Sequence, residues 1–276
     1  MKPLPPPSVD LVVSTYENPT ALDAILRRLK QGSLLPERLH VADDGSGRRT
    51  RELLQHTASD FPRPLLHHWH KDLGFRKCRI LNEALASCQA KYVIFLDGDC
   101  LPHRHFVRDH ARLAEPEHFT QGRRCFVNEE IVVDILEGKL DLLGAFLRGK
   151  LSGFLKAIRW PRPIIRRNQE QRGMIGCNWA AWRQDLEAIN GFDEEYEGWG
   201  LGEDSDVCSR LYNLGKTRKF VYGRALVYHL NHPEAEKSHL ETSHQRLKQT
   251  VESGKIRCER GLDLRVNEPN TSPKAS

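Results

Sequence analysis

Strongly apolar strand-like runs alternate with helical segments along the N-terminal third of the chain. The strongest run is YVIFL at residues 92–96, with other strand candidates at residues 9–16, 38–46 and 64–70. Apolar residues at helical spacing lie between them, at about residues 20–30, 48–54 and 77–90. This alternation predicts βαβ units, and runs that are apolar throughout fit a sheet covered on both faces. We therefore expect one α/β domain with a mostly parallel central sheet flanked by helices.

Polar residues stand where three of these predicted strands end. The clusters are Thr15-Tyr16-Glu17-Asn18, Asp43-Asp44-Gly45-Ser46 and Asp97-Gly98-Asp99. In open α/β sheets, ligands bind outside the carboxyl ends of the strands. We therefore expect the three clusters to converge on one crevice.

Asp97 and Asp99 flank a glycine directly after the strongest strand. At positions i and i+2 of an extended segment, both carboxylates can point to the same side of the chain. Such a pair suits Mg²⁺ or Mn²⁺ with coordination positions left for phosphate oxygens, whereas a bare diphosphate would be repelled. The pair predicts a diphosphate bridged by a divalent metal. Arg76 and Lys77 can add cationic contacts to that diphosphate, or can be ordinary surface charges of a helix.

Composition narrows the classes of protein that remain. The 276 residues carry a formal net charge of +5, too small to indicate nucleic-acid binding, and no recognised nucleic-acid-binding module is present. No stretch approaches the roughly 18 apolar residues of a spanning helix. The start, MKPLPPPSVD, lacks the apolar core of a signal peptide. We expect neither an integral membrane protein nor a secreted one.

The seven cysteines are odd in number, scattered, and never spaced as Cys-x-x-Cys. This pattern argues against a zinc knuckle and a disulfide scaffold, and it favours buried thiols in a reducing cytosol.

Four motifs together resemble the nucleotide-sugar half of family 2 glycosyltransferases with the GT-A fold. They are VVSTYENP, VADDGS, DLGFRKCRILNEAL and FLDGDC, within residues 9–105. The resemblance implies that Thr15 and Glu17 lie beside the nucleoside, that Asp44 contacts the base, and that Asp97 and Asp99 form the metal-binding Asp-x-Asp motif. The full set that we expect to bind the nucleotide sugar is Thr15, Tyr16, Glu17, Asp43, Asp44, Arg76, Lys77, Asp97 and Gly98.

A second informative block, residues 173–233, contains a Trp strand, a short helix and a glycine-rich acidic loop that opens another helix. Acidic residues at a helix N-terminus are also favoured for capping alone. The block resembles the galactosyltransferase-type acceptor half of the same superfamily, whose Trp-Gly…Glu-Asp motif matches Trp199, Gly200, Glu203 and Asp204. The resemblance implies that Asp204 is the catalytic base and that Glu203, Trp199 and Gly200 bind the acceptor.

His229 follows a short apolar strand, LVYH. A lone histidine at a strand end is usually structural. Members of the family with this acidic loop place a third metal ligand at the corresponding strand end, which the resemblance assigns to His229, with His232 as its competitor. Imidazole with two carboxylates is acceptable coordination for Mn²⁺.

The segment between the two blocks is basic. From Leu142 to Asn168 there are seven cations and no acid, interleaved with apolar residues at spacings of three and four. These spacings predict a cationic amphipathic helix, which would suit an anionic membrane surface. Packing on its own domain and a lid over an acidic acceptor are the alternatives.

These features predict a cytoplasmic, metal-dependent, inverting glycosyltransferase, in contact with the inner face of a membrane if the basic segment docks there. We expect a UDP-linked donor, a glycan or glycolipid acceptor, and a setting in bacterial surface polysaccharide or lipopolysaccharide assembly. The rivals are a metal-dependent nucleotidyltransferase and a non-catalytic glycan- or membrane-binding module. The sequence leaves the oligomeric state open.

The expected organisation is a Pro-rich segment at residues 1–8, a nucleotide-sugar-binding half at 9–133 and a basic amphipathic insertion at 134–172. An acceptor-binding half of the same domain follows at 173–260, and a disordered tail at 261–276.

Overall fold

The computed structural model describes residues 5–152, 158–170, 174–198, 202–232 and 240–266. An eight-stranded sheet runs in the order β3-β2-β1-β4-β10-β6-β11-β9, and a second sheet runs β5-β12-β7-β8. The strands of the larger sheet are β1 Val9–Thr15, β2 Arg38–Asp43, β3 Leu65–Trp69, β4 Tyr92–Asp97, β6 His118–Gln121, β9 Ile164–Asn168, β10 Asn178–Trp182 and β11 Thr217–Tyr222. Those of the smaller sheet are β5 Cys100–Pro102, β7 Arg123–Val127, β8 Leu151–Ser152 and β12 Leu226–Leu230.

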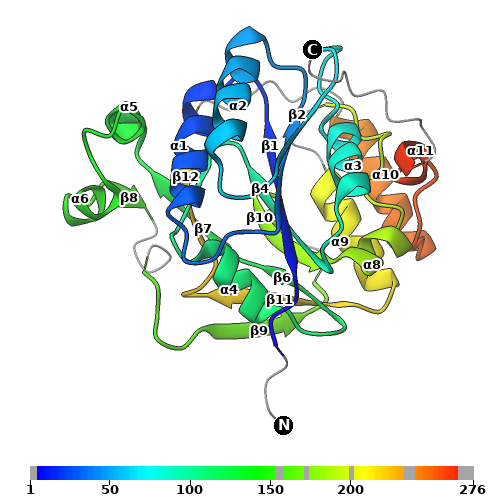
Figure 1. Cartoon of the computed structure of the whole chain (residues 1–276). Coiled ribbons are helices and arrows are strands. Elements are labelled where there is room, and N and C mark those ends of the chain that lie inside the picture. Colours follow the sequence, from blue (N-terminus) through cyan, green and yellow to red (C-terminus); the bar gives the residue numbers. More distant parts are fainter. Residues whose placement is uncertain (1–4, 153–157, 171–173, 199–201, 233–239, 267–276) are drawn as a thin grey trace.

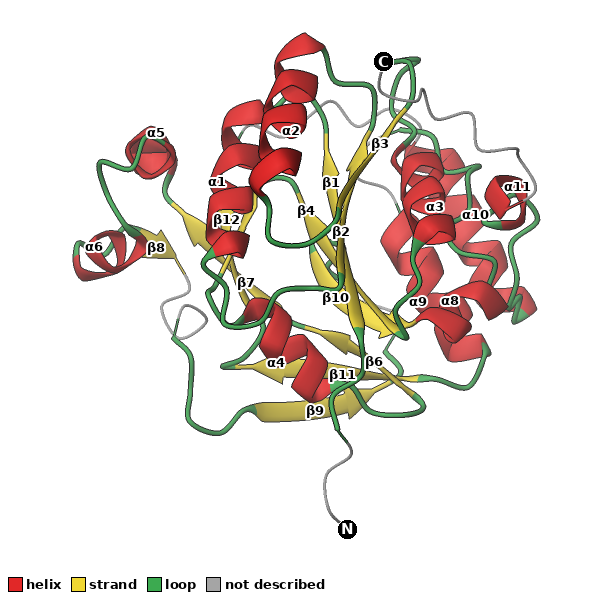
Figure 2. Ribbon diagram, in the orientation of Figure 1, coloured by secondary structure: helices red, strands yellow, loops and turns green. Residues whose placement is uncertain are grey.

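Helices cover both faces of the larger sheet (Figures 1 and 2). One face carries α1 Pro19–Lys30, α2 Arg48–Asp60 and α4 Phe106–Leu113, and the other carries α3 Lys77–Ser87, α8 Arg183–Ala188, α9 Glu203–Asn213 and α10 Leu240–Ser253. Shorter helices are η1 Glu129–Ile131, α5 Val132–Leu136, α6 Leu142–Leu147 and α11 Asp263–Val266. None of the helices in these described ranges is long and apolar enough to cross a membrane. The expected α/β architecture is confirmed.

Strands β1 to β4 form a parallel block of the larger sheet, and their register brings the polar strand ends together. Thr15 pairs with Asp43, and Ser14 pairs with Asp97. The carboxyl ends of β1, β2 and β4 therefore meet at one edge, which confirms the predicted convergence of strand ends. Strand β10 then runs antiparallel to β4 and adds the second half of the chain to the same sheet.

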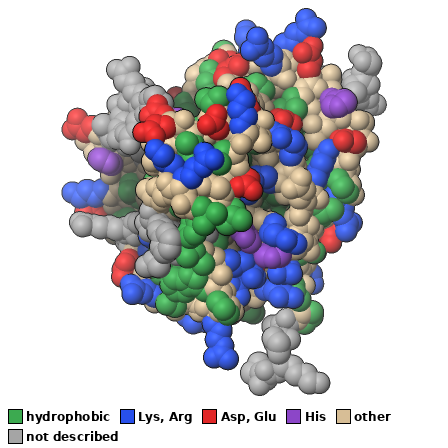
Figure 3. Space-filling view, turned by 90° about the vertical axis from the view of Figure 1, so that its left-hand side faces the viewer, with side chains coloured by type: hydrophobic (Ala, Val, Ile, Leu, Met, Phe, Trp, Pro, Cys, Tyr) green, Lys and Arg blue, Asp and Glu red, His purple; other side chains and the backbone are tan. Residues whose placement is uncertain are grey.

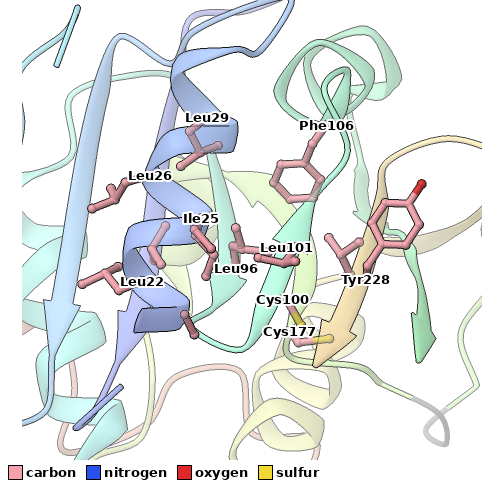
Figure 4. Packing of buried hydrophobic residues seen from close by; sticks show 14 of the residues in the cluster. Leu22, Ile25, Leu26, Leu29, Leu96, Cys100, Leu101, Phe106, Cys177 and Tyr228 are labelled. Carbon is pink, nitrogen blue, oxygen red and sulfur yellow. The ribbon is translucent and has the colours of Figure 1, made fainter. Parts of the chain in front are cut away.

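Helix α1 packs its apolar stripe on this sheet. Asn18 caps the helix by accepting a hydrogen bond from the Ala21 N–H at 3.1 Å, and Pro19 occupies the first turn, where a missing N–H costs nothing. Leu22, Ile25, Leu26 and Leu29 are buried in one core cluster, and Ile25 lies beside Leu96 of β4 and Leu101 of β5 (Figure 4). This packing fixes the chain on both sides of the Asp97-Gly98-Asp99 segment.

The basic segment does not form the expected amphipathic helix. Helix α6 ends at Leu147, Gly149 adopts a φ of 66°, and residues 164–168 form strand β9, which pairs with β11. Residues 153–157 lie outside the described residues. The prediction of one helix from residue spacing was wrong because Gly149, with its left-handed backbone conformation, ends α6, and Pro161 and Pro163 disfavour a helix further along the segment.

Several cations of this segment bind acids from elsewhere in the chain. Arg159 donates two hydrogen bonds to Asp109, at 3.0 and 2.7 Å, and Arg167 pairs with Glu115 at 2.9 Å. Leu143 and Leu147 on α6 are exposed, but the molecular face beside them mixes acidic with basic side chains (Figure 3). In the described part of this segment, a continuous cationic helix is thus replaced by separate elements, and Arg159 and Arg167 are paired within the domain. Contact with a membrane stays a prediction.

The start of the expected disordered tail is ordered. Residues 263–266 form α11, Leu262 is buried, and Arg265 pairs with Glu194 at 2.9 Å. Residues 267–276 lie outside the described residues. The expectation of disorder from Gly261 onward is thus wrong for its first residues, because a buried leucine and an ion pair hold them.

A buried arginine anchors α9. Arg210 donates from Nε to Asp206 at 2.7 Å and from Nη1 to the carbonyl oxygens of Ile189 and Gly191, at 2.6 and 2.8 Å. Asp206 also accepts a hydrogen bond from Thr250 of α10 at 2.8 Å. The network fixes the helix whose first residues are Glu203 and Asp204.

Replacing Arg210 by methionine should lower the free energy of unfolding by about 3–5 kcal/mol, because the buried Asp206 carboxylate and two carbonyl groups lose their partner. Urea denaturation measures this. Arg183→Met is the control, since its pair with Glu187 is exposed and should contribute under about 1 kcal/mol. Equal losses in the two variants would contradict a specific role for the buried network.

Candidate functional site

A cleft of about 690 Å³ lies at the carboxyl ends of β1, β2 and β4. Both halves of the chain line it, the first through the strand ends and α3, the second through residues 174–177 and the start of α9. The expected site residues that line it are Thr15, Tyr16, Asp44, Lys77, Asp97, Gly98, Asp99, Glu203 and Asp204. The structure thus gathers residues that lie nearly 190 positions apart in the sequence.

The Asp97-Gly98-Asp99 segment is held closely against β1. Ser14 donates a hydrogen bond from Oγ to Asp97 Oδ1 at 2.8 Å. A Cβ atom at Gly98 would lie 2.4 Å from the Ser14 carbonyl oxygen, so only glycine allows this approach. Sequence reasoning missed Ser14, although its place beside Thr15 at the end of β1 was a usable signal.

Two histidines reach Asp99 from the end of β12. Asp99 Oδ2 lies 3.2 Å from His229 Nε2 and 3.0 Å from His232 Nε2. Burial raises the pKa of Asp99, but its hydrogen bonds with the two histidines outweigh burial and hold the pKa well below its usual value. His232 lines the cleft, whereas His229 is the more buried of the two. Either imidazole can complete a ligand set with Asp97 and Asp99, so the choice between them remains a prediction.

The nitrogen and oxygen donors gathered here fit a divalent cation. Asp97 ends β4, Asp99 lies in the turn before β5, and His229 lies in β12. Asp99 and His229 are grouped within 4.8 Å together with Cys100, and carboxylate and imidazole ligands suit Mn²⁺ or Mg²⁺. Lys77 Nζ lies 2.9 Å from Asp97 Oδ1 and is the cation that partners this carboxylate. The residues present therefore fit the expected metal.

Lys77 connects the two acidic groups of the cleft. It is the first residue of α3, and its side chain is largely buried. Burial lowers the pKa of Lys77, but the carboxylates of Asp97, Asp204 and Glu203 outweigh burial and hold the pKa well above its usual value. The ammonium group therefore stays charged and offsets part of the negative charge of both carboxylate groups.

Glu203 and Asp204 open α9, directly after Gly202, whose φ of 106° requires glycine. A Cβ atom at Gly176 would lie 1.7 Å from Asp204 Oδ2, so the carboxylate occupies space that only a glycine leaves. Burial and the neighbouring Glu203 carboxylate raise the pKa of Asp204 to about 7, while Lys77 opposes the rise. The sequence alone did not single out Gly176.

Four of the expected site residues do not line the cleft. Asp43 is fully buried, and it accepts hydrogen bonds from Ser46 N at 2.8 Å and pairs with His67 at 2.9 Å. Glu17 accepts a hydrogen bond from Gly47 N at 2.7 Å, and the Arg76 guanidinium donates to the Lys71 carbonyl oxygen. These three side chains shape the loops beside the cleft.

His229 is the fourth, and it contacts two residues that line the cleft, Asp99 at 3.2 Å and the stacked ring of His232. Trp199 and Gly200 lie outside the described residues.

Asp44 lines the cleft, but both its oxygens already accept hydrogen bonds. Oδ1 lies 2.7 Å from His70 Nε2, and Oδ2 accepts from the Arg76 N–H at 2.9 Å. Burial lowers the pKa of His70, but hydrogen bonds with Asp44 and Glu83 outweigh it and raise the pKa. Sequence reasoning missed His70, whose partner lies 26 residues away on the neighbouring strand end.

Comparison with known families gives two matches. Residues 10–189 match the model of glycosyl transferase family 2, and residues 164–233 match that of the N-terminal domain of galactosyltransferase. The two ranges overlap at residues 164–189, and together they include all the described residues that line the cleft.

Two bacterial proteins named chondroitin synthase are similar over 83% of this chain. The Escherichia coli protein is 26% identical over 246 residues, and the Pasteurella multocida (strain Pm70) protein is 22% identical over 253 residues. The matched regions make up 35% and 25% of those proteins, so the chain spans about a third and a quarter of their lengths.

Two solved structures share the fold. GalNAc-T7 with UDP, GalNAc and Mn²⁺ gives a TM-score of 0.64 at 13% identity, covering 89% of this chain and 48% of that one. A mannosyltransferase from Pyrobaculum calidifontis in complex with GDP-Man and Mn²⁺ gives a TM-score of 0.54 at 16% identity, covering 87% and 60%.

The raised pKa of Asp204 predicts how its substitution changes stability with pH. A carboxyl whose pKa is about 7 when folded, against 3.8 as a reference, binds its proton more tightly in the folded chain. Its favourable contribution is present at low pH and is lost as the pH rises through about 7. Asp204→Asn should therefore make the metal-free protein more stable than the native chain at about pH 8, with the difference vanishing near about pH 4.

Urea denaturation in EDTA across this pH range measures the effect. Asp60→Asn is the control. A hydrogen bond from Lys30 lowers the pKa of Asp60, so removing this carboxylate should not stabilise the protein at high pH. An Asp204→Asn variant that is less stable than the native chain at about pH 8 would show that the carboxylate is not destabilised in the fold.

Proposed function

Because the chain belongs to glycosyl transferase family 2, we propose that it transfers a sugar from a nucleotide-sugar donor to an acceptor hydroxyl, with inversion at the anomeric carbon. One observation carries the proposal. The strand-end carboxylates Asp97 and Asp99 and the helix-end carboxylates Glu203 and Asp204 line a single cleft, with Lys77 between them. Sugar transfer needs one group of side chains that binds the donor diphosphate through a metal, and a second group beside it that accepts the proton of the acceptor hydroxyl.

The donor binds at the strand ends. Asp97 and Asp99, with His229 or His232, hold a divalent metal, which when bound neutralises charge on the diphosphate leaving group. Mn²⁺ and nucleotides or nucleotide sugars in the titles of the two similar structures support this assignment. Thr15, Tyr16 and Asp44 line the cleft for the nucleoside, and we propose UDP as the nucleotide.

Asp204 is the general base. A base works best when its pKa lies near the working pH, and burial with Glu203 brings the pKa of Asp204 to about 7. The carboxylate accepts the proton of the acceptor hydroxyl while that oxygen forms the bond to the anomeric carbon and the nucleoside diphosphate departs. A single base acting opposite the leaving group gives inversion. Glu203 binds the acceptor beside it.

We propose that the acceptor is a hydroxyl group of a glycan or glycolipid. The two relatives named chondroitin synthase are bacterial, and they favour a polysaccharide. Bacterial surface polysaccharide or lipopolysaccharide assembly in the cytoplasm is the setting that we propose. The Glu203–Asp204 pair favours transfer over a nucleotidyltransferase, whose chemistry gives that pair no role.

Nucleotide with Mn²⁺ should stabilise the protein, and EDTA should abolish the effect. A ligand at about 100 times its dissociation constant contributes about 2.7 kcal/mol, or roughly 2–4 °C per kcal/mol in melting temperature. Thermal unfolding with UDP, GDP and dTDP identifies the donor class. Asp99→Ala should lose the shift, whereas Asp60→Ala, at the exposed end of α2, should keep it. No shift with any nucleotide would favour a non-catalytic module.

Asp204→Asn should lower the rate of sugar transfer by about 10²–10⁴-fold, because the acceptor proton loses its base. Calorimetric affinity for the nucleotide and Mn²⁺ should stay within about twofold, since the donor group is separate. Asp60→Asn is the control for both measurements. Transfer that survives in Asp204→Asn would exclude Asp204 as the base, while a parallel loss of nucleotide binding would show that the carboxylate acts on the donor.

A further inference from the structure

A second group of metal-binding side chains lies under α3, away from the cleft. Asp10 is near the start of β1, His40 is in β2, and Cys88 directly follows α3. All three are buried, and one ligand atom from each lies within 4.8 Å of the others. Thr15 lies five positions after Asp10 in β1, which at about 3.3 Å per position places the group roughly 16 Å from the cleft end of that strand.

Only one of the two Asp10 carboxylate oxygens accepts hydrogen bonds. Its Oδ2 atom accepts hydrogen bonds from the N–H groups of Gln89 and Ala90, at 2.8 and 2.9 Å. Its Oδ1 atom is buried and has no hydrogen-bond partner, and its ion pair with Arg38 is long, at 4.0 Å. A buried carboxylate oxygen without a hydrogen bond is costly, so this oxygen is available to a metal ion.

The ring of His40 faces the same space. Its Nδ1 atom lies 3.1 Å from His68 Nε2, while its Nε2 atom is buried without a hydrogen-bond partner, 3.8 Å from Asp10 Oδ2. That distance is too long for a hydrogen bond. At this distance His68 Nε2 can accept a hydrogen bond from His40 Nδ1–H. The lone pair of His40 Nε2 then points towards the carboxylate.

We infer that Asp10, His40 and Cys88 bind a zinc-class divalent metal ion. Carboxylate oxygen, imidazole nitrogen and thiolate sulfur are the three ligand types of zinc, and water or the second Asp10 oxygen completes four-coordination. The Cys88 thiol releases its proton to solvent on binding, and the carboxylate and thiolate together balance the charge of the ion. His68 holds the His40 ring as an outer partner.

The ion would join three elements that also shape the cleft. Strands β1 and β2 end at Thr15 and Asp43, and α3 begins with Lys77. A metal bound at the opposite ends of these elements fixes their relative positions. None of the three ligands is among the residues that line the cleft, so the inference does not rest on the proposed transfer reaction.

Cobalt titration of the full chain tests the inference, because a thiolate bound to Co²⁺ gives a charge-transfer absorption band. We expect a band that saturates near one equivalent, disappears when zinc is added, and is absent in Cys88→Ser. His68→Val should keep the band but weaken binding about 10–100-fold. Asp10→Asn should also bind cobalt much more weakly. This variant provides the test if circular dichroism shows that Cys88→Ser does not fold.

Cys100→Ser is the matched control, because Cys100 lies with Asp99 and His229 at the cleft and is the other thiol close to such ligands in the described residues. The band should persist in this variant. A native chain without a band would overturn the inference, as would a band that survives in Cys88→Ser. Unchanged cobalt affinity in both Asp10→Asn and His68→Val would overturn it as well.

Discussion

The charge balance around Lys77 is the constraint on which the cleft depends. Asp97, Glu203 and Asp204 all raise its pKa, and the lysine in turn offsets part of their repulsion. Burial, with the neighbouring Glu203 carboxylate, raises the pKa of Asp204 to about 7, and Lys77 opposes that rise. The proposed base and the carboxylate proposed to bind metal thus share one ammonium group, whose position depends on where α3 begins.

The scaffold holds these charges through contacts that are short and sterically demanding. Gly98 and Gly176 leave room for the Ser14 carbonyl oxygen and the Asp204 carboxylate, positions in which any Cβ atom would clash. Arg210 fixes α9 from beneath through the turn at residues 189–191. The acidic pair therefore sits on a rigid helix end, as preorganised charge requires.

The parts of the fold that local patterns encode were predictable. β-Branched, fully apolar strands and well-capped helices such as α1 follow from neighbouring residues, and parallel register then brings Thr15, Asp43 and Asp97 together. The basic segment was not predictable in the same way. Gly149 ends its helix. Arg159 and Arg167 bind Asp109 and Glu115, some 50 residues away, so a local count of charges overstates the unpaired positive charge of the segment.

The sequence by itself determined the fold class, the strand-end position of the Asp97-Gly98-Asp99 segment and the helix-end position of Glu203 and Asp204. Each of these follows from periodicity and from residue type over a few positions. Only the tertiary structure decided which side chains face the cleft, that Asp43 stabilises a turn, and that Asp10, His40 and Cys88 meet under α3. Such outcomes depend on contacts between residues far apart in the chain, which no local pattern specifies.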